Sequence, residues 1–280
     1  MTERRPKEFM LTKEDFSFLA KLVYQQTGIV LAEHKRDMVY SRLARRIRAL
    51  NLFSFREYCD YVNANLEGEE LGQLVNAITT NLTSFFREKH HFEHLKTQVL
   101  EPFFKVGKEK KLRIWSAGCS QGSEPYSIAM VVADCMEKHK GFDVKILATD
   151  IDTNMLARGR SGSYRMEDLE SIPTQYRKYI SVKKREGEEG ILMAPKLREM
   201  ITFNQLNLLA EPWPMKGQFD VIFCRNVVIY FDKPTQKILF NRYADQAKSQ
   251  AWLYIGHSEN LFNVCDRFKL QGKTIYRKAT

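Results

Sequence analysis

The feature that most limits the possible folds is a short apolar segment that runs directly into a glycine-containing turn. Residues 112–117 predict a strand, residues 118–122 (Gly-Cys-Ser-Gln-Gly) a turn, and residues 125–138 a helix. The next apolar segment, residues 143–150, ends in an aspartate. Strands that alternate with helices are typical of a parallel sheet covered by helices, in which ligands bind at the carboxyl ends of the strands.

The same alternation continues towards the carboxyl terminus. Helices are expected at residues 154–159 and 233–249, and strands at residues 219–224 and 252–256. Residues 161–202 interrupt the pattern with two short apolar stretches, 180–184 and 191–194, on either side of the loop 185–190. We therefore expect an α/β domain that carries a small antiparallel β insertion at residues 161–202.

The first 100 residues have helical rather than strand periodicity. Thr12 is placed to cap a first helix that ends at Gly28, and further helices are expected at residues 35–50, 53–65 and 69–80. The helix expected at residues 35–50 carries four arginines that give it a basic surface: Arg42, Arg45, Arg46 and Arg48. We predict an all-helical domain over residues 1–85 and an α/β domain over residues 86–280.

Charge and cysteine content narrow the class of protein. The chain has 44 Lys and Arg against 34 Asp and Glu, and the resulting charge of +10 attracts nucleic acid, membrane surfaces or acidic proteins. Its five cysteines are scattered and form no C-x-x-C pair, which suits free thiols in a reducing cytoplasm. No apolar run approaches the roughly 18–20 residues that span a bilayer, and no secretory signal is recognised.

Two acids near the glycine turn predict the ligand. Asp150 ends the second strand, where a carboxylate can accept hydrogen bonds from ribose hydroxyls. Glu124 follows the first turn and favours a cationic ligand over a diphosphate. The turn lacks G-x-G-x-x-G, and no G-K-[ST] follows it. These residues predict that the ligand is S-adenosylmethionine. In the alternative interpretation both acids have structural roles only. Asp150 then forms an Asx turn or a helix cap, and Glu124 interacts with the helix dipole from the first turn.

Five segments together resemble the chemotaxis receptor methyltransferase family, CheR. In chain order they are N-L-T-S-F-F-R-E (81–88), A-G-C-S-Q-G-S-E-P-Y-S-I-A (117–129), A-T-D-I-D (148–152), F-C-R-N-V-V-I-Y-F-D (223–232) and G-H-S-E-N-L (256–261). The resemblance implies a Rossmann-like methyltransferase domain and protein-glutamate O-methyltransferase activity. It also implies a cytoplasmic protein that is recruited to membrane receptor arrays, where it methylates glutamates of transmembrane chemoreceptors.

The resemblance also implies roles for individual residues. Contacts with S-adenosylmethionine are implied for Asn81, Thr83, Arg87, Gly118, Glu124, Asp150, Asn207, Leu208, Arg225, Asn226 and Val227. Glu124 is expected to bind the methionine amino group and Asp150 the ribose, whereas residues 207–208 lie beside the adenine. Arg87 and Tyr230 are expected to face the methyl group as catalytic residues.

The expected chemistry needs no general acid or base. A receptor glutamate, with a reference pKa of about 4.3, is already ionised at neutral pH, and the leaving group is a neutral thioether. Catalysis then depends on holding the carboxylate about 3–3.5 Å from the methyl carbon. The planar fork of Arg87 suits that task, and Tyr230 orients groups by hydrogen bonding. The alternatives are a salt bridge for Arg87 and a core aromatic for Tyr230.

The resemblance implies partners as well. The basic helix is expected to dock on the helical bundle of the receptor, with a solvated charged face as the alternative. In part of the family the β insertion binds a carboxyl-terminal receptor pentapeptide by strand addition. Here the loop 185–190 is rich in glutamate rather than glycine. A monomer suffices for these roles, and no membrane insertion is expected.

Three other functions remain as alternatives. Residues 90–94 contain H-x-x-E-H, a zinc-peptidase signature, although no further ligand region stands out and no metal is predicted. A nucleic-acid methyltransferase fits the positive charge. However, the loop after residues 219–224 lacks the N/D-P-P-Y/F pattern of amino-group methylation. A non-catalytic regulator that binds S-adenosylmethionine is the third alternative.

Overall fold

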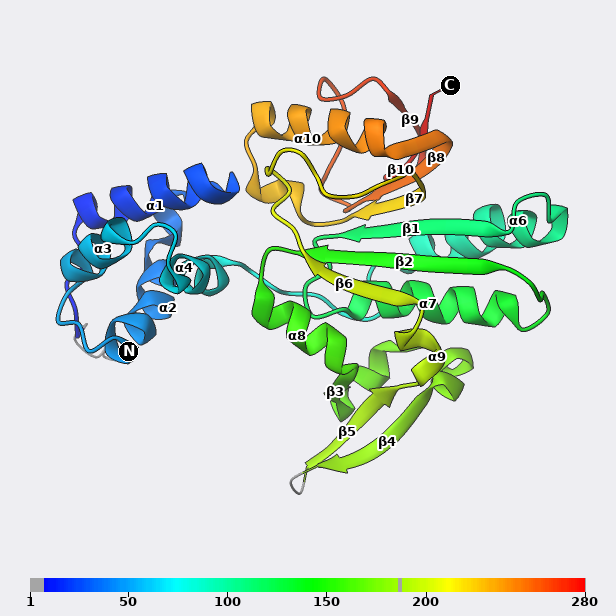
Figure 1. Ribbon diagram of the computed structural model, residues 1–280, viewed down its shortest axis with the longest axis horizontal. Coiled ribbons are helices and arrows are strands. Elements are labelled where there is room, and N and C mark those ends of the chain that lie inside the picture. Colours follow the sequence, from blue (N-terminus) through cyan, green and yellow to red (C-terminus); the bar gives the residue numbers. More distant parts are fainter. Residues whose placement is uncertain (1–7, 186–187, 280) are drawn as a thin grey trace, which may run out of the picture. The chain divides into compact units, whose positions relative to one another are not determined.

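The computed structural model describes residues 8–185 and 188–279 (Figure 1). Two compact units divide the chain between Thr80 and Asn81. The helical unit consists of the residues through Thr80 together with Tyr230–Asp232, and the sheet unit consists of all the others. The domain limits 1–85 and 86–280 stay a prediction.

Helices form nearly all of the amino-terminal part of the helical unit, as predicted. They are α1 (Lys13–Thr27), η1 (Glu33–Lys35), α2 (Arg36–Ala49), α3 (Phe55–Ala64) and α4 (Glu69–Ile78). The Thr12 hydroxyl accepts a hydrogen bond from the Asp15 amide at 3.1 Å, and the Asp15 carboxylate accepts one from the Thr12 amide at 3.2 Å. Gly28, with a φ of 71°, ends α1. The predicted cap at Thr12 and the predicted end of this helix are therefore confirmed, and Asp15 completes a capping box.

A seven-stranded mixed sheet forms the centre of the sheet unit (Figure 1). Its order is β6 (Ile201–Gln205), β2 (Asp143–Asp150), β1 (Lys111–Ala117), β7 (Phe219–Cys224), β8 (Ala247–Ile255), β10 (Ile275–Lys278) and β9 (Phe268–Gly272). The first five of these strands are parallel, whereas β10 and β9 pair antiparallel. Ala117 of β1 is in register with Thr149 of β2, so the carboxyl ends of the two strands lie side by side.

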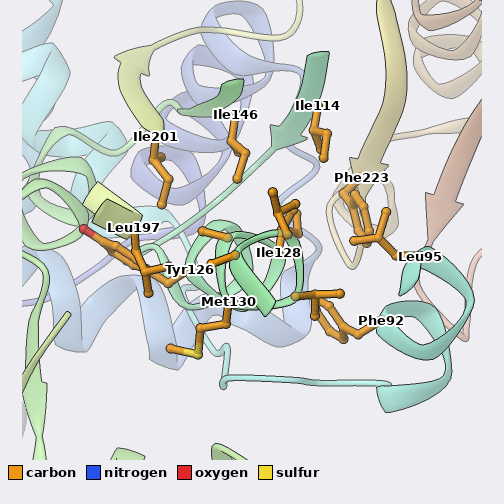
Figure 2. Packing of buried hydrophobic residues seen from close by; sticks show 14 of the residues in the cluster. Phe92, Leu95, Ile114, Tyr126, Ile128, Met130, Ile146, Leu197, Ile201 and Phe223 are labelled. Carbon is orange, nitrogen blue, oxygen red and sulfur yellow. The ribbon is translucent and has the colours of Figure 1, made fainter. Parts of the chain in front are cut away.

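The turn that follows β1 leads directly into helix α7 (Ser123–Met136), so the packing of this helix determines where the turn lies. Figure 2 shows Tyr126, Ile128 and Met130 among the side chains of the strands and the neighbouring helices. Outside the β insertion the chain also forms α5 (Lys89–His94), the π-helical η2 (Leu95–Leu100), α6 (Glu101–Val106), α8 (Thr153–Ser161), the short η5 (Val228–Tyr230) and α10 (Lys233–Gln246). Because α7 is buried nearly all round, it packs as a core helix rather than as a surface helix.

The β insertion is a separate three-stranded antiparallel sheet in the order β3-β5-β4. It comprises β3 (Ser163–Arg165), η3 (Met166–Ser171), η4 (Thr174–Tyr179), β4 (Ile180–Arg185), β5 (Glu188–Met193) and α9 (Pro195–Arg198). The expected range 161–202 is too long at its end, because Ile201 and Thr202 pair with β2 of the main sheet. Two residues of the predicted loop 185–190, residues 186–187, lie outside the described part of the chain.

A second boundary also differs from the sequence-based expectation. The helix predicted at residues 233–249 ends at Gln246, because Ala247 already pairs with Phe219 of β7 as the first residue of β8. The five cysteines are free and buried. None of the helices in the described ranges is long and apolar enough to cross a membrane.

Candidate cofactor site

The turn between β1 and α7 is tied to the end of β2. The amides of Gly118 and Cys119 both donate to the carbonyl of Thr149, at 2.8 and 2.9 Å. Gly118 has a φ of 80°, and a Cβ atom on it would lie 2.3 Å from Cγ2 of Val227. A side chain cannot occupy this position unless the side chain of Val227 moves, so the backbone itself forms the surface of the turn.

Replacing Gly118 by alanine should therefore destabilise the protein more than the backbone angle alone explains. Gly141 is a matched control because it has the same φ of 80°, and a Cβ atom there would meet none of the described residues within 4 Å. We expect Gly118→Ala to lower the free energy of unfolding by about 1–3 kcal/mol more than Gly141→Ala, as typical of overpacking. Urea denaturation measures both losses, and equal losses would show that Val227 yields without cost.

Asp150 is buried at the end of β2 and faces the same turn. Its carboxylate accepts hydrogen bonds from the amide of Ser120 at 2.7 Å and from the amide of Asp152 at 2.9 Å. The second bond forms the Asx turn that the alternative interpretation expects. The cap of α8 is formed by Asp152 and not by Asp150, because the Asp152 carboxylate accepts from the first amides of that helix. An ionised carboxylate offers about four acceptor positions, so the bonds from the amides of Ser120, Ile151 and Asp152 leave room for a ribose hydroxyl.

Burial raises the pKa of Asp150 to about 6, above the value of about 3.9 for an unfolded chain. The folded protein therefore holds this proton more tightly than the unfolded chain does. The stability that the proton contributes is lost as pH rises from about 4 to about 6. Relative to Asp150→Asn, the wild-type protein should lose stability over that interval and no further above it. Chemical denaturation across the interval measures the difference, and parallel curves would contradict the assignment.

Glu124, in the first turn of α7, forms a buried ion pair with Arg225 from the loop after β7. The Glu124 carboxylate accepts from the Ser116 hydroxyl at 2.7 Å and from Nη1 of Arg225 at 3.0 Å. Nη2 of Arg225 donates to the carbonyl of Arg87 and lies 3.4 Å from Oε2 of Glu88. Burial raises the pKa of Glu124, and the guanidinium opposes that rise.

The charge of this cluster suits a cationic ligand. One guanidinium, that of Arg225, lies between the carboxylates of Glu124 and Glu88, so the three ionised groups carry one net negative charge. Burial alone raises the pKa of Glu88, but the charge of Arg225 and hydrogen bonds from His257 hold it below its ordinary value. Nε of Arg225 and Oε2 of Glu88 are buried and make no hydrogen bond within the described residues. Such unsatisfied groups are expected where a ligand completes a site.

Arg87 lies between two residues with left-handed backbone angles, Phe86 with a φ of 52° and Glu88 with a φ of 57°. Such angles are rare for residues other than glycine and persist only when surrounding contacts hold them. The amide of Phe86 donates to the Ser127 hydroxyl at 3.0 Å, and its ring stacks on Tyr176. The guanidinium of Arg87 donates to the carbonyl of Leu82 at 3.0 Å. Fixed contacts on both sides thus hold Arg87 in place.

Other predicted residues surround the same strand ends. Asn81 donates to the Asp152 carboxylate at 2.8 Å and its side-chain oxygen accepts from Ser120 at 3.3 Å. Thr83 is half-buried. In the loop after β6, the side chain of Asn207 accepts from the amide of Leu209, and Leu208 is buried.

The loop after β7 depends on a residue that the sequence did not single out. The buried carboxylate of Glu259 accepts from the amides of Asn226 at 3.1 Å and Val228 at 3.0 Å. Asn226 itself has a φ of 58°. Glu259, like Glu88, lies inside a quoted segment, but Asn226 and Val228 are more than 30 residues away from it in the chain.

Tyr230 is not part of the sheet unit that contains Arg87 and the other residues predicted to bind the cofactor. It belongs to the helical unit, where its carbonyl accepts from the amide of Val30.

The first and last histidines of the H-x-x-E-H segment, His90 and His94, have different neighbours. Potential ligand atoms of Glu88, His90 and His91 lie within 4.8 Å of one another, whereas Nδ1 of His94 lies 2.9 Å from the Tyr254 hydroxyl.

Three of the four arginines of the basic helix have partners within the helical unit. Arg42 donates to the carbonyls of Ala77, Ile78 and Thr79 at the end of α4. Arg46 forms two hydrogen bonds with the buried Glu70, and Arg48 pairs with Glu8. Arg45 is exposed. The basic surface is therefore partly used to hold α2 against α4.

Comparisons with known proteins agree with this architecture. Residues 81–277 match the family model "CheR methyltransferase, SAM binding domain", and residues 14–79 match "CheR methyltransferase, all-alpha domain". A Rhizobium etli protein named "Probable chemotaxis protein methyltransferase" is 44% identical, over 92% of this chain and 97% of that protein.

Two further relatives are named "Chemotaxis protein methyltransferase". The Salmonella typhimurium protein is 42% identical over 99% of this chain and 92% of its own length. The Escherichia coli protein is 42% identical over 99% of this chain and 93% of its own length. The buried acids and the net negative cluster fit the cationic S-adenosylmethionine that the matched domain binds. The chain belongs to the CheR methyltransferase family and uses S-adenosylmethionine as its cofactor.

Proposed function

We propose that this protein methylates glutamate side chains of membrane chemoreceptors, forming glutamyl methyl esters. The observation that carries the proposal is a pair of buried carboxylates, Glu124 after the turn that follows β1 and Asp150 at the end of β2, in a chain that matches both CheR domains. The names of the relatives support a role in chemotaxis. The corresponding location is the cytoplasm, from which the protein is recruited to membrane receptor arrays.

The residues around the turn fit S-adenosylmethionine, which supplies an electrophilic methyl group when bound. We assign the ribose hydroxyls to Asp150 and the methionine amino group to Glu124, because both acids are buried and retain acceptor positions. Asn207 and Leu208 border the adenine in this proposal. The remaining contacts are assigned to Asn81, Thr83, Gly118, Arg225, Asn226 and Val227.

The protein's part in the reaction is orientation. The receptor carboxylate is ionised at neutral pH and needs no base. Arg87 guides it, because a guanidinium binds a carboxylate through two parallel hydrogen bonds. The Tyr230 hydroxyl orients the reacting groups by hydrogen bonding. The contacts that hold residues 86–88 support this role, since a guiding group must not move during the reaction.

Transfer of a labelled methyl group tests the proposal. The purified protein is incubated with methyl-labelled S-adenosylmethionine and cytoplasmic fragments of chemoreceptors. We expect label on glutamates that is released at alkaline pH, as for a carboxyl ester. Fragments with the acceptor glutamates changed to alanine are the control. Label on RNA or DNA instead would favour a nucleic-acid methyltransferase. Cofactor binding without any transfer would favour a regulator.

Receptor docking is proposed for the basic face of α2, and Arg45 is its most direct test. Arg42 and Arg46 hold α2 against α4, so replacing either one would change the stability of the protein as well as any docking. Arg45→Ala should raise the KM for receptor fragments and flatten the salt dependence of methylation, because an exposed charge acts through screened attraction. Arg56→Ala, an exposed arginine of α3, is the control. Unchanged KM at low salt in Arg45→Ala would remove this docking face.

Binding of a receptor carboxyl-terminal pentapeptide by the β insertion is a further part of the proposal. In the order β3-β5-β4, strand β4 lies at an edge and has backbone groups available for strand addition. Calorimetry with candidate pentapeptides measures this binding. If millimolar peptide gives no heat of binding, the β insertion does not bind the pentapeptide. The helical bundle of the receptor then remains as the proposed contact.

A further inference from the structure

The segment Tyr230–Asp232 is held by the helical unit, although the chain enters and leaves it from the sheet unit at Ile229 and Lys233. Three contacts within the helical unit hold it. The amide of Val30 donates to the Tyr230 carbonyl at 2.9 Å, and the Tyr24 hydroxyl donates to the Asp232 carboxylate at 2.8 Å. Nζ of Lys35 lies 5.2 Å from the centre of the Tyr230 ring.

The sequence of the helical unit explains why these three contacts converge. Tyr24 lies in the last turn of α1, and its carbonyl accepts from the amide of Gly28, whose left-handed angle ends the helix. The chain then passes through Val30 to η1, which ends at Lys35. The end of a helix, the following loop and a short 3-10 turn thus each supply one contact with the same three-residue segment.

We infer that Lys35 is a positioning residue for Tyr230. This inference rests on the proposed function, in which the Tyr230 hydroxyl orients the reacting groups. An ammonium within about 6 Å of a tyrosine ring is attracted to the ring face. That attraction fixes the ring and with it the direction in which the hydroxyl points. The bonds from Val30 and Tyr24 fix the backbone that carries the ring.

A consequence is that other residues of the helical unit affect the step that is proposed for Tyr230. Tyr230 owes its place to residues of α1, the following loop and η1. Substitutions there should therefore alter kcat, whereas substitutions that affect only docking should alter KM.

Methyl transfer by Lys35 variants tests the inference. We expect Lys35→Met to lower kcat about 2–5-fold, the size of a cation–π contact at a partly exposed site. The affinity for S-adenosylhomocysteine should not change. Lys35→Arg should restore most of the rate, because a cation remains over the ring. Lys21→Met, which removes an exposed lysine of α1, should leave kcat unchanged. In a Tyr230→Phe background, Lys35→Met should have a smaller effect, because the hydroxyl through which it acts is absent.

A second measurement does not depend on activity. With a fluorinated tyrosine at position 230, the fluorine NMR shift should move in Lys35→Met and stay in place in Lys21→Met. If that shift moves but the wild-type protein methylates no receptor fragment, the proposed function fails and the contact stands. An unmoved shift, a kcat equal to that of Lys21→Met, or an undiminished Lys35→Met effect in Tyr230→Phe would overturn the inference.

Discussion

Replacing Arg225 by methionine should lower the free energy of unfolding at neutral pH by about 3–5 kcal/mol, the cost of removing one partner from a buried ion pair. The Arg225 side chain is only 3% exposed, and it bonds Glu124, lies beside Glu88 and donates to the Arg87 carbonyl. Without it, Glu124 loses its buried counter-charge, and Glu88 keeps its hydrogen bonds from His257 but loses the guanidinium. Urea denaturation measures the loss. Binding of S-adenosylhomocysteine should weaken in parallel, because the loop that carries Arg87 loses its anchor.

The same substitution at Arg56 is the matched control. Arg56 pairs with Asp60 at 3.3 Å, but both side chains are more than half exposed. Such pairs contribute little, so Arg56→Met should leave the unfolding midpoint nearly unchanged. Acidification should also restore part of the stability of Arg225→Met. Burial raises the pKa of Glu124, and the rise should be larger without the guanidinium, so the cost falls as Glu124 becomes protonated. Equal effects of the two substitutions would contradict the buried network.

Replacing Arg87 by alanine should reduce kcat/KM for receptor fragments about 10–100-fold, the range expected when a guiding contact in the reaction is lost. Stability should change little, because the half-buried guanidinium donates only to the Leu82 carbonyl among the contacts described. Arg87→Lys should restore part of the rate, since an ammonium supplies charge without the planar fork. Label transfer measures kcat/KM, and calorimetry with S-adenosylhomocysteine separates catalysis from cofactor binding.

Arg158→Ala, at an exposed position of α8, is the control for a general loss of positive charge. It should methylate receptor fragments at the wild-type rate. A kcat/KM for Arg87→Ala that equals that of Arg158→Ala would remove Arg87 from the reaction. A loss confined to cofactor affinity would assign Arg87 to binding alone.

Local patterns predicted much of the fold. The strands at residues 143–150 and 219–224 have the expected limits, because apolar runs end at polar or glycine-containing turns. The strand residues 201–205 were missed, since only Ile201 and Phe203 of this short edge segment are buried. Residues 247–249 look helical in sequence, and only their pairing beside β7 makes them a strand.

The site was predictable at the level of residue types but not of contacts. The positions of Glu124 and Asp150 followed from the turn and the strand end beside them. That Arg225 lies between Glu124 and Glu88 depends on partners about 100 and 140 residues away, which no local pattern reports. Helical periodicity likewise cannot show that Arg46 faces Glu70 rather than solvent. It also cannot show that Tyr230 belongs to the helical unit.

The most direct test of the account is a crystal structure with S-adenosylhomocysteine bound. The account predicts ribose hydroxyls within hydrogen-bond distance of the Asp150 carboxylate and the amino group of the ligand on Glu124. The Gly118 backbone should line the ligand. A nucleoside bound elsewhere, or one that leaves Asp150 with only its backbone amide partners, would contradict it.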